Sequence, residues 1–88
     1  MHLIPEGLKM TKLVVKLSGK AEERFQELLN ETGVSGKDVV LDALALLHFA
    51  VMETIGGRKI AAFNPKTKEA RPFSLPSLNI VESKSKAG

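Results

Sequence analysis

Cysteine and tryptophan are absent from the 88 residues of the chain, and only two histidines are present. The lack of thiols excludes disulfides, thiolate zinc sites and thiol nucleophiles. His2 and His48 lie far apart in the sequence, and no residue one turn away from His48 is a metal ligand, so we predict no metal site and no cofactor. A domain this small has a marginal core. Since disulfides and metals are excluded, a second subunit is the expected source of stability.

Long apolar runs and catalytic groupings are also lacking. The longest apolar stretch, residues 39–52, contains Asp42 and His48 and is too short to span a membrane. No basic segment followed by an apolar run opens the chain, so we expect no secretory signal and a cytoplasmic protein. No carboxylate pair, serine–base pair or phosphate-binding glycine loop has a suitable spacing. We therefore predict that the chain is not an enzyme.

Positive charge is concentrated toward the two ends of the chain, whose formal net charge is +3. Residues 1–18 hold three lysines against one glutamate, and residues 58–88 hold seven cations against two carboxylates. Residues 19–57 hold three cations against seven carboxylates. This distribution favours a polyanionic partner bound away from the central segment. Two solvated basic tails around a helical core would give the same distribution.

Residues 12–17 have the alternation of a β-strand. One face would carry the apolar side chains of Leu13, Val15 and Leu17. The other face would carry the side chains of Lys12, Val14 and Lys16. No second strand lies close enough in the sequence to form a hairpin with this one.

Two helices are predicted after this strand. The first, over residues 20–32, has a narrow apolar stripe and ends at Gly33. The second, over residues 36–55, has Ser35 as its N-cap and is apolar almost all round. Such a helix must be buried on most sides, and one amphipathic helix and a short strand cannot cover it. The chain therefore needs a second copy, a covering element after residue 57, or both.

The C-terminal third of the chain has the pattern of a β-hairpin over residues 58–75. Asn64-Pro65 indicates a type I turn between two short segments, and Pro72 would confine the second strand to a sheet edge. Phe63 and Phe73 are expected to form its packing face rather than to stack on bases. We predict a disordered tail over residues 77–88 and a flexible arm over residues 1–10.

An unpaired strand leaves its backbone N–H and C=O groups without partners. Residues 12–17 could pair with the C-terminal hairpin, or antiparallel with the same segment of a second subunit. We favour the second arrangement because one dimerisation would satisfy the strand and cover the second helix. A two-stranded ribbon of this kind fits the major groove of DNA, where Lys12 and Lys16 could reach guanine or phosphate and Val14 a thymine methyl. The same alternation of polar and apolar side chains also fits any half-buried strand that exposes its polar face to solvent.

In order and spacing, these features resemble the ribbon-helix-helix family of DNA-binding proteins, of the Arc, methionine-repressor and CopG type. The resemblance covers residues 10–57. It is carried by residues 13–18, by Phe25, Leu28 and Leu29 of the first helix, by the link Gly33-Val34-Ser35, and by Val40, Ala43, Leu44 and Leu47 of the second helix. Residues 58–88 lie outside it, and the second helix is longer and more apolar than the pattern needs.

The resemblance implies a mainly α-helical fold with a β-ribbon, in which two chains form an intertwined homodimer whose ribbon enters the major groove. Residues 11–57 would be the dimerisation and DNA-binding domain, and residues 58–76 a hairpin extension. The residues implied to contact bases are Lys12, Val14 and Lys16, although many family members carry a hydrogen-bonding side chain in place of Val14. Those implied to contact phosphates are Ser35, Gly36 and Lys37. Those expected to form the dimer core are Leu13, Val15, Leu17, Phe25, Leu28, Val40, Ala43, Leu44 and Leu47.

We therefore expect a homodimeric, sequence-specific DNA-binding protein that regulates transcription as a repressor on double-stranded DNA. Dimers of this family often bind side by side, so assembly beyond the dimer stays open. The basic residues Arg58, Lys59, Lys66 and Lys68 could add contacts to the DNA backbone outside the groove. One alternative is a protein-interaction module, such as an antitoxin, that binds a partner protein through residues 58–88. Another is an architectural dimer with no DNA role.

Overall fold

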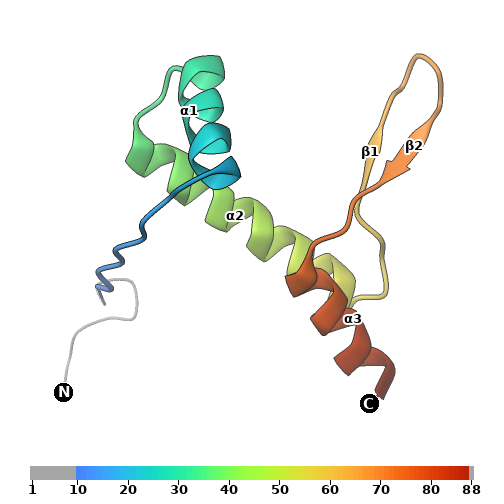
Figure 1. The fold of residues 1–88 in the computed structure, drawn as a ribbon. Coiled ribbons are helices and arrows are strands. Elements are labelled where there is room, and N and C mark those ends of the chain that lie inside the picture. Colours follow the sequence, from blue (N-terminus) through green and yellow to red (C-terminus); the bar gives the residue numbers. More distant parts are fainter. Residues whose placement is uncertain (1–9, 88) are drawn as a thin grey trace. The chain divides into compact units, whose positions relative to one another are not determined.

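The structure, a computed structural model, describes residues 10–87 (Figure 1). It is a small, mainly helical domain in which three helices accompany one two-stranded antiparallel hairpin. In chain order the elements are α1 (Lys20–Thr32), α2 (Gly36–Ile55), β1 (Ala61–Phe63), β2 (Ala70–Pro72) and α3 (Pro76–Ala87). The chain divides into two units, the first ending at Gly33 and the second beginning at Val34. The arm predicted for residues 1–10 lies outside the described residues except for Met10.

The first unit contains residues 10–18, which have no regular secondary structure, and α1. Glu22 and Glu23 lie in the first turn of α1, where negative charge is favourable next to the positive end of the helix dipole. The helix ends at Gly33, which has a φ of 72° and donates its backbone N–H to the carbonyl of Leu29 at 2.9 Å. A left-handed residue of this kind is a common helix stop, and glycine adopts it without strain. The predicted helix over residues 20–32 is confirmed.

The second unit begins with α2, whose predicted bounds are also confirmed. The Oγ of Ser35 accepts a hydrogen bond from the backbone N–H of Asp38 at 3.2 Å, and the carbonyl of Ser35 accepts one from Val39 at 3.0 Å. Ser35 is thus the N-cap, as its position before an apolar run predicts. At the other end, the N–H of Gly56 donates to the carbonyl of Met52 at 3.1 Å, and Gly56-Gly57 ends the helix.

The hairpin predicted from the Asn-Pro signal is present. Strands β1 and β2 pair antiparallel, with Ala62 opposite Arg71 at the centre of the register. In the turn, the Oδ1 of Asn64 accepts a hydrogen bond from the backbone N–H of Lys66 at 2.9 Å, and the N–H of Asn64 donates to the carbonyl of Glu69 at 2.9 Å. Asparagine commonly closes a turn onto its own following backbone in this way. Pro72 is on an edge strand, because a sheet of two strands has only edges.

Phe63 and Phe73 do not form the packing face predicted for them. Phe63 is 60 % exposed and Phe73 is 53 % exposed. The N–H of Phe73 donates to the carbonyl of Ile60 at 3.0 Å, so Phe73 lies opposite Ile60, whereas Phe63 lies opposite Ala70. Since side chains alternate along a strand, this register places the two rings on opposite faces of the hairpin.

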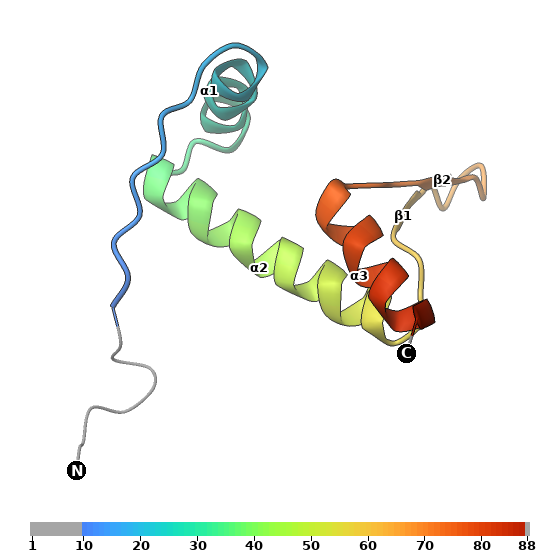
Figure 2. The ribbon, with the colours of Figure 1, turned by 60° about the horizontal axis from the view of Figure 1, so that its bottom comes forward.

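The prediction of a disordered tail over residues 77–88 is wrong, because α3 occupies Pro76–Ala87. Proline is well suited to the first turn of a helix, where its missing N–H costs nothing. Figure 2 shows α3 alongside the C-terminal half of α2, and the two helices pack against each other. Leu78 of α3 and Ala50 of α2 are both only 5 % exposed. A helix this short depends on such packing more than on its own propensity, which is why the local sequence does not reveal it.

None of the helices within residues 10–87 is both long enough and apolar enough to cross a membrane. In the same residues, no three side chains of the metal-binding types His, Cys, Asp and Glu come together as a potential metal site.

Candidate nucleic-acid interface

The β-strand predicted for residues 12–17 is not formed in the single chain, where this segment has no regular secondary structure and its side chains are exposed. Lys12, Val14 and Lys16, the predicted base-contacting residues, are all exposed. The opposite row is open too, with Leu13 71 % and Val15 61 % exposed. Among the described residues, no backbone hydrogen bond joins this segment to another element, and β1 and β2 pair only with each other.

The predicted phosphate-contacting residues lie at the start of α2, in the second unit. The Oγ of Ser35 is engaged as the helix cap. Gly36 and Lys37 are in the first turn, where backbone N–H groups have no partner within the helix. Such groups, together with the helix dipole, attract a phosphate. Asp38 lies in the same turn, and its exposed carboxylate offsets part of this attraction.

The residues expected to form the dimer core all remain accessible in the single chain. Phe25 and Leu47 are half-buried, whereas Leu13, Val15, Leu17, Leu28, Val40, Ala43 and Leu44 are exposed. Within residues 10–87, the buried hydrophobic side chains are only Val39, Ala50 and Leu78. Burial of apolar surface is the main favourable contribution to folding. The core among the described residues is therefore small, and several large apolar side chains of α2 are exposed.

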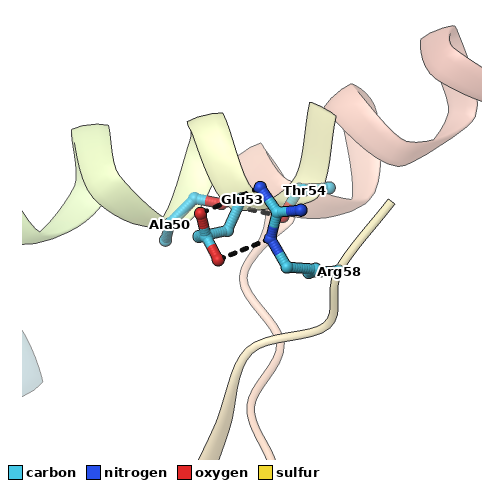
Figure 3. Close-up of polar contacts among 4 residues, drawn as sticks. All are labelled: Ala50, Glu53, Thr54 and Arg58. Atoms are coloured by element: carbon cyan, nitrogen blue, oxygen red, sulfur yellow. Dashed lines mark hydrogen bonds and ion pairs between the residues drawn. The ribbon is translucent and has the colours of Figure 1, made fainter. Parts of the chain in front are cut away.

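Arg58 and Lys59, two of the predicted contacts to the DNA backbone, are engaged within the chain. The Nε of Arg58 donates to Oε1 of Glu53 at 2.7 Å, and its Nη2 donates to Oε2 at 3.1 Å (Figure 3). This bidentate hydrogen bond holds the pKa of the Glu53 carboxyl below its ordinary value and raises the pKa of Arg58. Lys59 forms an ion pair with Glu82 of α3.

A glycine makes room for the first of these ion pairs. A Cβ added to Gly56 would lie only 2.7 Å from Nη2 of Arg58. Any larger residue would therefore push the guanidinium away from its present position beside Glu53. Sequence analysis identified Gly56-Gly57 only as a helix stop. It missed the ion pair because Glu53 and Arg58 are five residues apart across that stop, outside the spacing of pairs on a helix.

The other predicted backbone contacts, Lys66 and Lys68, lie in the hairpin turn and are exposed. Arg71 of β2, which sequence analysis did not single out, is exposed close by. In the part of the chain that the structure describes, none of these three cations is paired with a carboxylate. Their positive charge is therefore available to a polyanion, unlike that of Arg58 and Lys59.

No protein-family model matches the chain, and neither curated protein sequences nor solved structures yielded a similar protein. A function for this chain is therefore inferred from its own residues and the contacts that they form. Two of its features bear on nucleic-acid binding directly: the open segment 12–17 and the unpaired cations of the hairpin.

Proposed function

We propose that the chain is a homodimeric, sequence-specific DNA-binding protein of the ribbon-helix-helix type, acting as a transcriptional repressor. The observation that carries this proposal is the state of residues 12–17. The sequence of this segment alternates lysine-bearing and apolar positions. In the single chain it has no regular secondary structure, its backbone forms no hydrogen bond to another element among the described residues, and its apolar side chains are exposed. Two helices follow it directly, and a second copy would complete the ribbon.

Antiparallel pairing of two such segments about a two-fold axis would satisfy the backbone of both. Leu13, Val15 and Leu17 would then face the helices of the dimer. Full burial of a large aliphatic side chain contributes roughly 1.5–3 kcal/mol. The exposed apolar side of α2, which includes Leu44, supplies the complementary surface. Dimerisation thus accounts for both uncovered apolar regions at once.

The paired ribbon would present Lys12, Val14 and Lys16 of both chains on its outer face. In the major groove, lysine ammonium groups hydrogen-bond to the O6 and N7 of guanine, and an aliphatic side chain contacts the methyl group of thymine. The N–H groups of Gly36 and Lys37 would hold a phosphate and thereby fix the register of the ribbon on the duplex.

Selection of bound fragments from a random pool of duplex DNA, with the full chain, tests this function. We expect enrichment of a short inverted repeat, because a two-fold dimer reads two equivalent half-sites. On the enriched sequence, the double variant Lys12→Gln and Lys16→Gln should lose its preference over random DNA. Lys20→Gln with Lys84→Gln, which removes the same charge elsewhere, should retain that preference. A pool that shows no enrichment would contradict the proposal.

One observation favours the alternative of a protein-interaction module. Phe63, Phe73 and Ile80, all in the C-terminal region, are each more than half exposed. Phe63 and Phe73 lie on opposite faces of the hairpin, so each ring offers a separate apolar contact to a partner. Deletion of residues 58–88 would not isolate this function, because it removes α3 from α2. Phe63→Ser and Phe73→Ser are the sharper variants: loss of a bound protein partner with intact DNA binding would support the interaction module.

A further inference from the structure

Three cations gather on the hairpin without carboxylate partners. Lys66 and Lys68 lie in the turn between β1 and β2, and Arg71 lies in β2. The nearest carboxylate in sequence, Glu69, accepts a hydrogen bond at Oε1 from the hydroxyl of Thr67 at 3.3 Å. All three cations are exposed and unpaired in the described part of the chain. The hairpin is thus a locally positive surface.

The hairpin is an ordered element, with both of its ends secured. At its base, the residues that lead into β1 are held by two ion pairs, Arg58 with Glu53 of α2 and Lys59 with Glu82 of α3. At its tip, the Oδ1 of Asn64 accepts hydrogen bonds from the backbone N–H groups of Lys66 and Thr67. The cations are therefore presented on a preorganised arm, which loses less entropy on binding than a flexible tail.

The backbone at the tip shows that a lysine is placed there against its conformational preference. Lys68 has a φ of 65°, in the left-handed region that favours glycine and asparagine. Glycine would satisfy the same turn without strain. The chain nevertheless has a lysine there, so a third cation lies between Lys66 and Arg71 in the sequence of the hairpin.

The hairpin and the phosphate-contacting turn of α2 lie at opposite ends of one helix. Ser35 precedes α2, and the hairpin follows its C-terminal end (Figure 1). A helix of 20 residues is about 30 Å long. Phosphates along one DNA strand repeat about every 3.4 Å of the helix axis. A duplex that contacts both the start of α2 and the hairpin would therefore be bound over more base pairs than a duplex that contacts the ribbon alone.

We propose that the β1–β2 hairpin is a second phosphate-binding element, which holds duplex DNA through Lys66, Lys68 and Arg71. This inference rests on the proposed function, since it concerns the same DNA ligand. Lysine and arginine side chains on an exposed turn suit phosphate groups, which are the same at every base pair. The contribution of the hairpin to DNA affinity is therefore independent of the DNA sequence. Arg58 and Lys59 have a different role: they position the hairpin and do not contact DNA.

The salt dependence of binding tests this directly, with a mixed-sequence 40-base-pair duplex as the probe. The variant to compare with the wild type is Lys66→Gln, Lys68→Asn and Arg71→Gln, in which asparagine suits the left-handed backbone at position 68. Each neutralised phosphate adds about 0.9 to the slope of log affinity against log salt. We expect the slope to fall by roughly 0.9 for each phosphate that the variant no longer binds. The control Lys20→Gln, Arg24→Gln and Lys84→Gln removes the same charge and should keep the wild-type slope.

The outcomes separate this inference from the proposed function. If the hairpin variant keeps the wild-type slope and affinity, the hairpin inference is overturned while the ribbon proposal stands; the positive surface then serves another partner, such as an acidic protein. If the salt dependence of affinity is weaker in the hairpin variant but the wild type selects no sequence from a random pool, the hairpin inference is supported and the repressor proposal fails. Failure of the wild type to bind any duplex would overturn both. Circular dichroism of each variant confirms that the helices are retained.

Discussion

At the residue scale, Asp38 determines how strongly the start of α2 can hold an anion. Its backbone N–H is already bound by Ser35, and its carboxylate occupies the turn whose dipole would otherwise attract a phosphate. The chain therefore gains helix stability from the residue that weakens the proposed phosphate site. In the proposed complex, glycine at position 36 would still allow close approach of the DNA backbone.

We expect Asp38→Asn to tighten DNA binding about two- to five-fold, which corresponds to the roughly 0.3–1 kcal/mol of a charge at a helix end. Asparagine removes the negative charge and keeps the size of the side chain. Asp42→Asn, one turn further along α2, removes the same charge away from the helix end and should change the affinity less. Titration of a labelled duplex at low salt measures both. Equal effects of the two variants would show that only the net charge matters.

A second prediction at this scale concerns the pH response of the Glu53–Arg58 pair. The hydrogen bond from Arg58 lowers the pKa of Glu53, so the folded chain binds this proton less readily than the unfolded chain does. The pair therefore stabilises the fold above the ordinary carboxyl pKa, and that contribution is lost as the pH falls through the lowered value. In an NMR titration, Arg58→Gln should raise the titration midpoint of Glu53. Arg24→Gln should leave it unchanged, and a midpoint insensitive to Arg58 would contradict the assignment.

At the scale of elements, local sequence signals were sufficient to predict the helices and turns whose conformation depends on residues close to them in the sequence. Capping by Ser35, the glycine stops at positions 33 and 56 and the Asn-Pro turn were enough to predict α1, α2 and the hairpin. Helix α3 was missed because its formation depends on burial of Leu78 against α2, an interaction between residues distant in sequence. The exposure of Phe63 and Phe73 was missed for a related reason, since strand pattern alone does not reveal which face another element covers.

The burial of Leu78 allows the packing of α3 against α2 to be tested. Leu78→Ala should lower the free energy of unfolding by about 2–5 kcal/mol, the range for deleting a buried leucine side chain. Ile80→Ala, on the same helix but at a residue that is 56 % exposed, should cost less than about 1 kcal/mol. Urea denaturation at one fixed protein concentration compares the two. If Ile80→Ala were the more damaging change, α3 would bury its other face instead.

The candidate site was only partly predictable at this scale. Sequence pattern placed lysines on one side of residues 12–17 and additional cations near the hairpin. It could not separate Arg58 and Lys59, which are engaged by Glu53 and Glu82, from Lys66 and Lys68, which are unpaired. That distinction depends on how the end of α2 and the middle of α3 approach the base of the hairpin, and therefore on tertiary structure.

At the scale of the whole molecule, few hydrophobic side chains are buried among the described residues. Val39, Ala50 and Leu78 are the buried ones, while the apolar row of residues 12–17 and much of α2 stay open. In the proposed homodimer, a partner of identical sequence would supply a complementary surface with no further component. Stability would then depend on protein concentration, because unfolding and dissociation are coupled in an obligate dimer.

The proposed homodimer requires residues 12–17 to pair with the same segment of a second chain. Isotope-filtered NMR on an equimolar mixture of labelled and unlabelled chains tests it most directly. We predict intermolecular nuclear Overhauser effects between the backbone protons of residues 12–17 of the two chains, in an antiparallel pattern. A chain that shows no intermolecular effects in this segment, or one in which the segment pairs within its own chain, would contradict the account.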